Sequence, residues 1–166
     1  GVFAIGWATD VGRVRGHNED ALFVVSSEQE ASDAAPAFGL FMVADGMGGH
    51  QSGEAASSLA LRVAGSQLLS HVYMPLMSGT NNEGDLPSLT DVVREAISQA
   101  NRAVTRDLPG SGSTLTCGMV FENRLFLGHV GDSRAYLLRA GQSPVRLTKD
   151  HSLVGRLIEM GQLTKE

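Results

Sequence analysis

The sequence has a single cysteine, Cys117, and few aromatic residues, which make up 5% of its 166 residues. A lone cysteine excludes an internal disulfide framework, and its apolar surroundings (TCGMV) predict a buried strand in a reducing, cytoplasmic environment. The chain has no block of Lys or Arg and a net charge of −5, which argues against nucleic acid as a partner. Its longest apolar stretch, residues 38–44, is far shorter than the roughly 20 residues of a membrane span. We therefore expect a globular protein without a membrane span in this chain.

The composition and the order of apolar runs predict one domain over residues 1–166, with 42% hydrophobic and 19% charged residues. Runs rich in Val, Phe, Ile and Leu predict strands at residues 2–9, 21–26 and 38–44. Apolar residues three or four apart predict two helices, from Gly53 to Leu68 and from Leu89 to Val104, the second beginning after an S-x-x-D signal at Ser88. Residues 74–87 look like a connection. Strand character returns at residues 114–121, 125–130 and 135–138, as a meander, and residues 152–160 predict a short third helix.

The strands are mostly apolar on both faces, so both faces of each sheet should be covered. In residues 125–130, for example, Leu125 and Leu127 point one way while Phe126 and Val130 point the other. Tight turns make consecutive strands antiparallel, and two long helices can cover only one side of each sheet. Two sheets must then cover each other. The predicted fold class is α+β: an antiparallel β-sandwich flanked by α-helices in α-β-β-α layers.

The stretch FMVADGMGGH, residues 41–50, carries Asp45 from an apolar strand into a glycine-rich turn. An Asp-Gly pair by itself is typical of a β-hairpin, but no second strand follows here. A loop that binds nucleoside triphosphates needs Lys and Ser or Thr after its last glycine, where this chain has Glu54 and Ala55. Asp45 is therefore a candidate for a chemical role.

Two other polar segments supply further acids. RVRGHNED, residues 13–20, ends in the adjacent acids Glu19 and Asp20, and it could be a solvated loop. Near Asp45, however, these acids would suit a hard cation, because Mg²⁺ and Mn²⁺ take about six oxygen ligands. HVGDSR, residues 129–134, carries Asp132, which by spacing alone is better explained as a turn residue between two strands.

Together, five segments resemble the bacterial PPM-type, or type 2C, protein serine/threonine phosphatases: TDVGRVRGHNEDA, VADGMGGH, GST at residues 112–114, VGDSR and LTKDHS. They extend through essentially the whole chain, which is similar to the N-terminal two-thirds of such a catalytic domain. Members of the family continue through a flap and further strands that supply an SDG and a DN segment. Neither segment occurs here, so the resemblance implies a domain that lacks the flap and the C-terminal strands.

The resemblance implies metal ligands and a substrate-binding residue. Asp45 would bridge two Mg²⁺ or Mn²⁺ ions, with the backbone carbonyl of Gly46 as a ligand of one of them. Glu19 and Asp20 would bind the same ion directly or through water, and Asp132 would help to hold a third, weaker ion. Arg15 would grip the substrate phosphate, because a guanidinium can bind two phosphate oxygens at once.

Three further motif residues, Thr114, Ser133 and Arg134, are expected to be structural supports. The proton donor stays open, because animal members carry His where this chain has Met47, and His50 is assigned no role.

The implied activity is hydrolysis of phosphoserine and phosphothreonine in proteins by a water or hydroxide that bridges the two ions. The expected partners are phosphorylated proteins, as substrates shared with bacterial-type Ser/Thr kinases. A second hypothesis is a catalytically impaired phosphatase-like binding or regulatory module, which the missing SDG and DN acids favour. A third is a regulatory phosphatase of the anti-sigma-antagonist pathway, against which the R-x-x-N-E-D form of the arginine loop argues.

Overall fold

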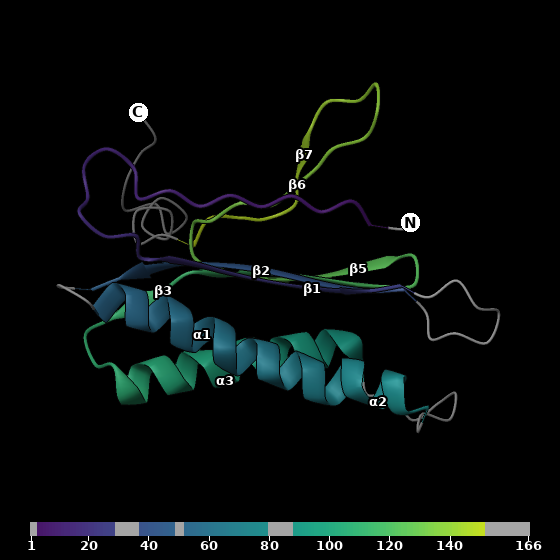
Figure 1. Ribbon diagram of the computed structural model, residues 1–166, viewed down its shortest axis with the longest axis horizontal. Coiled ribbons are helices and arrows are strands. Elements are labelled where there is room, and N and C mark those ends of the chain that lie inside the picture. Colours follow the sequence, from purple (N-terminus) through teal and green to yellow (C-terminus); the bar gives the residue numbers. More distant parts are fainter. Residues whose placement is uncertain (1–2, 29–36, 49–51, 80–87, 152–166) are drawn as a thin grey trace, which may run out of the picture.

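A computed structural model describes residues 3–28, 37–48, 52–79 and 88–151 of the chain (Figure 1). Its centre is an antiparallel sheet in the order β1-β2-β4-β5, formed by Asp20–Ser27, Phe38–Met47, Leu115–Phe121 and Arg124–Val130. The two-residue strand β3, Gly112–Ser113, pairs with the far end of β2. The helix predicted at residues 152–160 lies outside the described residues.

Both long helices, α1 (Ser52–Leu68) and α3 (Leu89–Asp107), pack on the same face of this sheet (Figure 1). Their buried residues are mostly small, among them Ala56, Ala60 and Ala64 of α1, which lets the helices lie close to the strands. Ser88 begins α3 as predicted, because its side chain accepts a hydrogen bond from the Asp91 backbone N–H. The core lies between these helices and the alternate residues of β2 and β4 that face them.

The helical segment that begins with α1 continues beyond the predicted end. A π-helical turn, Leu69–Tyr73, follows α1, and the short helix α2, Met74–Ser78, follows that turn. The prediction of a connection from residue 74 was therefore wrong for residues 74–78. Pro75 does not prevent α2, because proline fits the first turn of a helix, and Gly79 ends the helix in the left-handed conformation.

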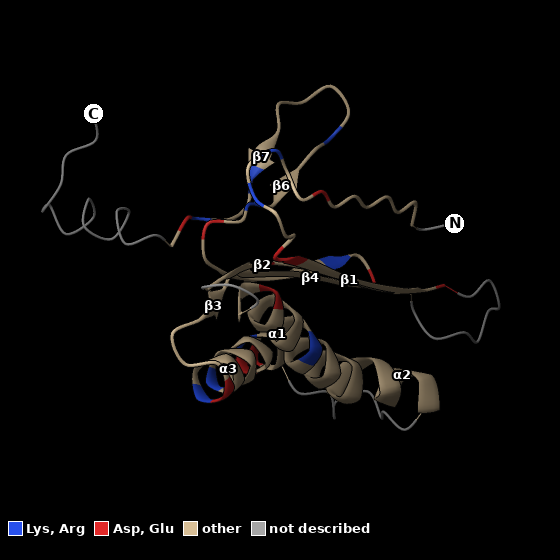
Figure 2. Cartoon of the chain, turned by 60° about the vertical axis from the view of Figure 1, so that its left-hand side comes forward, with Lys and Arg blue, Asp and Glu red and all other residues tan. Residues whose placement is uncertain are grey.

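The other face of the sheet is crossed by the N-terminal segment and by a hairpin that stands off the sheet (Figures 1 and 2). The hairpin consists of β6 (Tyr136–Leu137) and β7 (Val145–Arg146), which pair with each other. The predicted meander therefore ends after β5, since the third strand joins β7 and not β5. This face also holds a cavity of about 560 Å³, lined by Trp7, Phe41 and Leu127 among others.

The N-terminal segment is not a strand over the described part of the predicted range, residues 3–9. A strand needs a neighbour that accepts and donates its backbone hydrogen bonds. Among the described residues the segment instead contacts the sheet through side chains, and the Phe3 and Phe41 ring centroids lie 5.9 Å apart in an edge-on arrangement.

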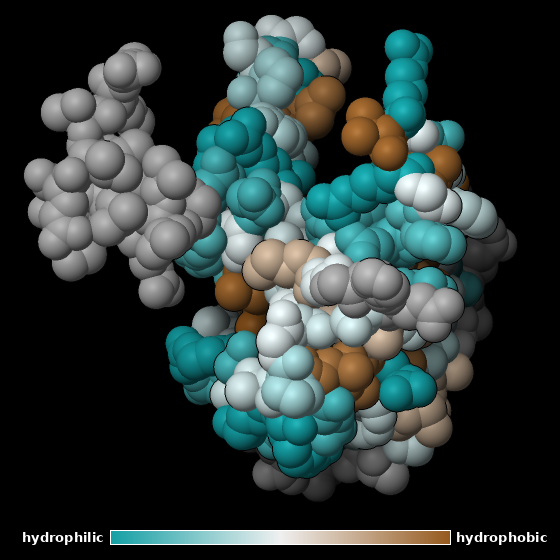
Figure 3. Space-filling view, turned by 90° about the vertical axis from the view of Figure 1, so that its left-hand side faces the viewer, coloured by the Kyte–Doolittle hydropathy of each residue, from teal (hydrophilic) through white to brown (hydrophobic). Residues whose placement is uncertain are grey.

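The α+β class with an antiparallel sheet and helices is confirmed. In the described residues both long helices cover one face of the central sheet, and of the predicted second sheet only the two-stranded β6–β7 hairpin is present. Large apolar side chains also reach the surface at scattered places, as the brown atoms of Figure 3 show for one face. Leu138 and Val145 of the hairpin region and Met74 of α2 are among the exposed ones. Within the described residues, no helix combines the length and the apolar character that crossing a membrane requires.

Candidate functional site

The first pair of predicted acids lies side by side on the face of the sheet opposite the helices. Asp45 of β2 is directly opposite Asp20 of β1 in the antiparallel register, and directly opposite residues point to the same side of a sheet. Partial burial and the carboxylate of Asp20 raise the pKa of Asp45, and Asp132 raises it further against the opposing effect of Arg15. The ionised form of Asp45 is therefore disfavoured at this site, and a bound cation would stabilise it.

Strand β2 extends farther than predicted, so that Asp45 lies inside the strand and not at its end. Gly46 and Met47 still pair, with Ser113 and Gly112 of β3. The pairing was hidden from sequence reasoning because the partner residues lie more than sixty positions away.

The loop before β1 places Arg15 and Glu19 next to each other. Arg15 Nη1 lies 2.5 Å from Glu19 Oε2; the Arg15 side chain is 66% exposed and that of Glu19 13%. Asn18 braces the loop, since its side chain donates to Thr9 Oγ1 at 2.6 Å and accepts from the Asp20 backbone N–H at 3.0 Å. The guanidinium is thus available to solvent at the rim of the Asp20–Asp45 pair.

Two glycines let the start of α1 approach the strand ends. A Cβ atom on Gly46 would lie 1.9 Å from the carbonyl oxygen of Gly53, and one on Gly53 would lie 2.5 Å from Glu19 Oε1. The Gly46 backbone N–H also donates to the Glu19 carbonyl at 3.1 Å. The Glu19 side chain therefore lies against the first turn of α1, where the positive end of the helix dipole favours a carboxylate. Sequence reasoning did not assign this role to Gly53.

Asp132 approaches the same region from the turn after β5. Gly131, with a φ of 106°, makes the sharp bend that only glycine adopts readily. The next residue but one, Ser133, forms a 2.8 Å hydrogen bond with Thr114. Thr114 also accepts a 2.9 Å hydrogen bond from the Asp45 backbone N–H. Thr114 and Ser133 thus have the supporting contacts expected of them.

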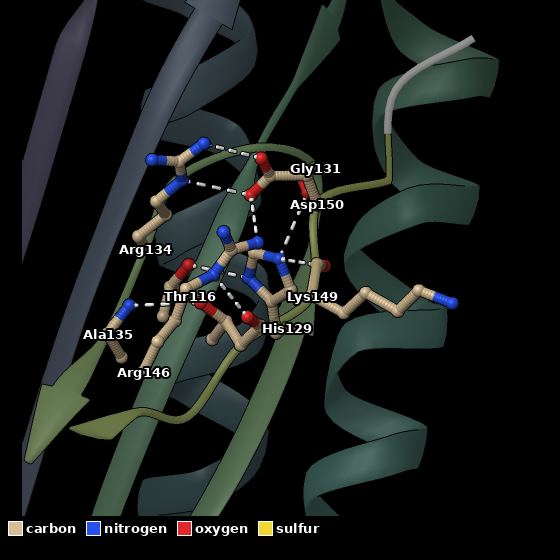
Figure 4. Close-up of polar contacts among 9 residues, drawn as sticks. Thr116, His129, Gly131, Arg134, Ala135, Arg146, Lys149 and Asp150 are labelled. Atoms are coloured by element: carbon tan, nitrogen blue, oxygen red, sulfur yellow. Dashed lines mark hydrogen bonds and ion pairs between the residues drawn. The ribbon is translucent and has the colours of Figure 1, made fainter. Parts of the chain in front are cut away.

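The outer side of this turn is held by a polar network (Figure 4). The Nε2 atom of His129 lies 3.0 Å from the Gly131 carbonyl and 3.1 Å from the Lys149 carbonyl. Because carbonyl oxygens only accept, Nε2 carries the hydrogen, and Nδ1 accepts from the Thr116 hydroxyl at 2.9 Å. This tautomer ties the turn to the segment after β7, so the contacts of His129 are structural.

The same network contains an ion-pair cluster around Asp150. Arg134 binds both carboxylate oxygens of Asp150, at 3.2 and 2.7 Å, and Arg146 binds one of them at 2.8 Å. Hydrogen bonding to Arg134 lowers the pKa of Asp150. Arg134 thus supports the turn through Asp150.

The predicted metal ligands are of the chemical type that a hard cation binds, but too few of them lie together to form a complete site. Asp20, Asp45 and Glu19 offer carboxylate oxygens, which Mg²⁺ and Mn²⁺ prefer. Within the described residues, however, no group of three or more His, Cys, Asp and Glu side chains is arranged to hold a metal ion. Asp20 and Asp45 form the adjacent pair, while Glu19 is turned to Arg15 and Asp132 acts on Asp45 through its charge.

The fold and these motifs define a phosphatase-like domain, and comparison with known proteins identifies the family. Residues 8–156 match the protein phosphatase 2C family. The serine/threonine phosphatase stp of Listeria innocua serovar 6a is 38% identical over an alignment of 164 residues, and the match covers 95% of this chain and 58% of that protein. PstP of Mycobacterium tuberculosis is 36% identical over an alignment of 161 residues, and the match covers 95% of this chain and 27% of that protein.

Solved structures of phosphatases support the same family. The crystal structure of M. tuberculosis PstP/Ppp is 34% identical with a TM-score of 0.65, and the match covers 95% of this chain and 58% of the PstP/Ppp chain. Stp1 of Staphylococcus aureus is 30% identical with a TM-score of 0.66, and covers 95% of this chain and 57% of its own. The chain belongs to the protein phosphatase 2C family, and it spans rather more than half the length of the Listeria relative.

Proposed function

We propose that the protein to which this chain belongs hydrolyses phosphoserine and phosphothreonine esters in other proteins, with the help of Mg²⁺ or Mn²⁺ ions. The observation that carries the proposal is the cross-strand pair of Asp20 and Asp45 next to the exposed guanidinium of Arg15. Two like charges beside a cationic side chain suit a site that takes a divalent cation and a phosphate dianion. The relatives, which are named serine/threonine phosphatases, support the choice of substrate.

The chain's residues would divide the work by charge. Asp45, Asp20, Glu19 and the carbonyl of Gly46 would hold two ions, and Asp132 would contribute to a third. When bound, such ions lower the pKa of water and neutralise the charge of the phosphate.

Arg15 would bind the phosphate oxygens. For this purpose it would leave its contact with Glu19, so that the Glu19 carboxylate becomes free for a cation at the same time. We further propose that residues 1–166 belong to one catalytic domain. Its location would be the cytoplasm, which the single buried cysteine supports. Its protein substrates would be those of bacterial-type Ser/Thr kinases.

The direct test is Mn²⁺-dependent release of phosphate from a phosphothreonine peptide. Asp45→Asn removes the carboxylate that would touch both ions, so activity should fall by orders of magnitude. Asp107→Asn is a matched control, because Asp107 lies at the exposed end of α3 and pairs with Arg106. Equal activity of wild type and the Asp45 variant would refute the assignment.

A second candidate is a phosphatase-like module without catalysis. It is favoured by the small number of acids at the site, because in the described residues only Asp20 and Asp45 form an adjacent pair and no third ligand completes a metal-binding group. Two carboxylates leave an Mg²⁺ ion mostly hydrated, so the 166-residue chain alone should bind Mn²⁺ weakly and turn over slowly. Calorimetric titration of the chain with Mn²⁺, run alongside the phosphate assay, tests this expectation for the 166-residue chain. Tight binding at two sites with brisk turnover would exclude the non-catalytic module, and it would also show that the SDG and DN acids are dispensable.

A further inference from the structure

A chain of two hydrogen bonds joins the strand that carries Asp45 to the turn that carries Asp132. The Asp45 backbone N–H donates to Thr114 Oγ1 at 2.9 Å, and Thr114 Oγ1 lies 2.8 Å from Ser133 Oγ. Since Thr114 Oγ1 accepts from the backbone, its own hydrogen can be donated to Ser133. Ser133 follows Asp132 directly in sequence. One hydroxyl group therefore connects the two acid-bearing segments.

The methyl group of Thr114 makes a second, independent contact with the same turn. A Cβ atom on Gly131 would lie 2.6 Å from Thr114 Cγ2 and 2.8 Å from Thr114 Cβ. The turn thus packs directly on Thr114, in a space that exists because residue 131 is glycine. Thr114 is itself fixed to β2, because its backbone N–H donates to the Asp45 carbonyl at 2.9 Å.

The contacts on the outer side of the turn serve a different purpose. His129 anchors the turn to the segment after β7 (Figure 4). The His151 backbone N–H does the same by donating to the Gly131 carbonyl at 2.7 Å. The contacts of Thr114, by contrast, join the turn to the backbone of Asp45.

We propose that Thr114 is a positioning residue whose hydroxyl fixes the Asp132 turn relative to Asp45, so that the two carboxylates act on cations as one unit. The proposal rests on the proposed function in giving both acids a role in cation binding. The mechanical part of it, the coupling of the turn to the strand, can be tested without any metal.

Two variants at this position separate the hydroxyl from the methyl. Thr114→Val keeps the branched shape and loses the hydroxyl, whereas Thr114→Ser keeps the hydroxyl and loses the methyl. Ser133→Ala removes the other partner of the same hydrogen bond. In the metal-free protein, Thr114→Val should speed amide exchange at Asp45 about tenfold or more and shift the amide resonances of residues 132–134. Thr114→Ser should leave both near wild type, and the amide of Ala100 in α3 should exchange at its wild-type rate in every variant.

Mn²⁺ affinity, measured by water-proton relaxation on folded protein, tests the purpose of the coupling. Thr114→Val and Ser133→Ala should each weaken binding several-fold, and the double variant should bind no more weakly than Thr114→Val, because both remove one shared interaction. Thr114→Ser should bind within about twofold of wild type, as rescue by the retained hydroxyl requires.

The outcomes that overturn the proposal differ from those that overturn the proposed function. If wild type binds Mn²⁺ through Asp45 and folded Thr114→Val binds it equally well, or if the two single effects add, Thr114 is not a positioning residue. If wild type shows no Mn²⁺ binding that Asp45→Asn abolishes, the proposed function fails. In that case unchanged resonances of residues 132–134 in Thr114→Val would overturn the coupling too, and shifted ones would support it.

Discussion

Replacing Gly46 by alanine should destabilise the protein strongly, although the change adds a single methyl group. The new Cβ atom would lie 1.9 Å from the Gly53 carbonyl oxygen, 2.5 Å from the Gly53 carbonyl carbon and 3.0 Å from the Glu19 carbonyl oxygen. All three are backbone atoms, so no side chain can rotate away. The start of α1 must instead move from the end of β2 by about 1.5 Å before an ordinary contact is restored.

Overpacking of this kind typically lowers the free energy of unfolding by about 1–3 kcal/mol. Because the neighbours are rigid backbone atoms, we expect Gly46→Ala to cost about 3 kcal/mol. For a chain of this size, each kcal/mol lowers the midpoint of thermal unfolding by about 2–4 °C, so a loss of about 6–12 °C is expected. Circular dichroism in metal-free buffer measures it. Gly6→Ala is the matched control, because a Cβ there meets no atom within 4 Å. That variant should unfold at the wild-type temperature or slightly above it. A Gly46→Ala midpoint within about 2 °C of wild type would refute the reasoning.

Three other predictions concern single side chains. Asp45→Asn should raise the metal-free unfolding midpoint at pH 7 by about 1–3 °C, because a partly exposed like-charge contact is worth under about 1 kcal/mol. Because the pKa of Asp45 is higher in the folded than in the unfolded protein, protonation of this carboxyl stabilises the fold. This stabilisation is complete below the ordinary pKa of about 4 and is lost as the pH rises. The advantage of the variant should therefore vanish near pH 4, and an advantage that persists there would contradict the assigned cause. Arg15→Ala should raise the inhibition constant of free phosphate several-fold while Mn²⁺ affinity does not fall, because the Glu19 carboxylate stays available to a cation, with Arg13→Ala as the control in the same loop; a collapse of metal affinity would make Arg15 a scaffold for Glu19. Burial raises the pKa of Cys117 to about 12, so iodoacetamide at pH 8 should modify it only as the protein unfolds, and fast labelling of the native protein would contradict its place in β4.

Local sequence patterns predicted the elements that depend on local interactions. The S-x-x-D signal located the start of α3, because Ser88 caps that helix with its own side chain. The apolar runs of β2 and β4 indicated their positions to within a few residues. By contrast, the last residues of β2 pair with Gly112 and Ser113, and the strand at residues 136–137 pairs with β7. Both pairings depend on partner strands that are far away in the sequence or too short to show a strand pattern.

The candidate site was found through the family resemblance and not through periodicity. Spacing alone left Asp20 and Asp132 open to explanation as loop and turn residues, and the structure places both within electrostatic reach of Asp45. The contacts of Gly53 with Glu19 could not have been predicted, because a close approach of backbone leaves no signal beyond the glycine itself. The same holds for Thr114, whose importance lies in which two segments its hydroxyl joins.

The π-helical turn between α1 and α2 gives this part of the chain an unusual tolerance to a change in length. A π turn holds one residue more than an α-helical turn, so the helices on either side keep the orientation of a regular helix that is one residue shorter. Removing the exposed Ser70 should convert the turn to regular helix and leave Leu68 and Val72, both fully buried, facing the core. The same deletion in the middle of α3 would rotate half of that helix by about 100° and expose its buried face. Natural variation of one residue in length should therefore collect at residues 69–73 and avoid α3.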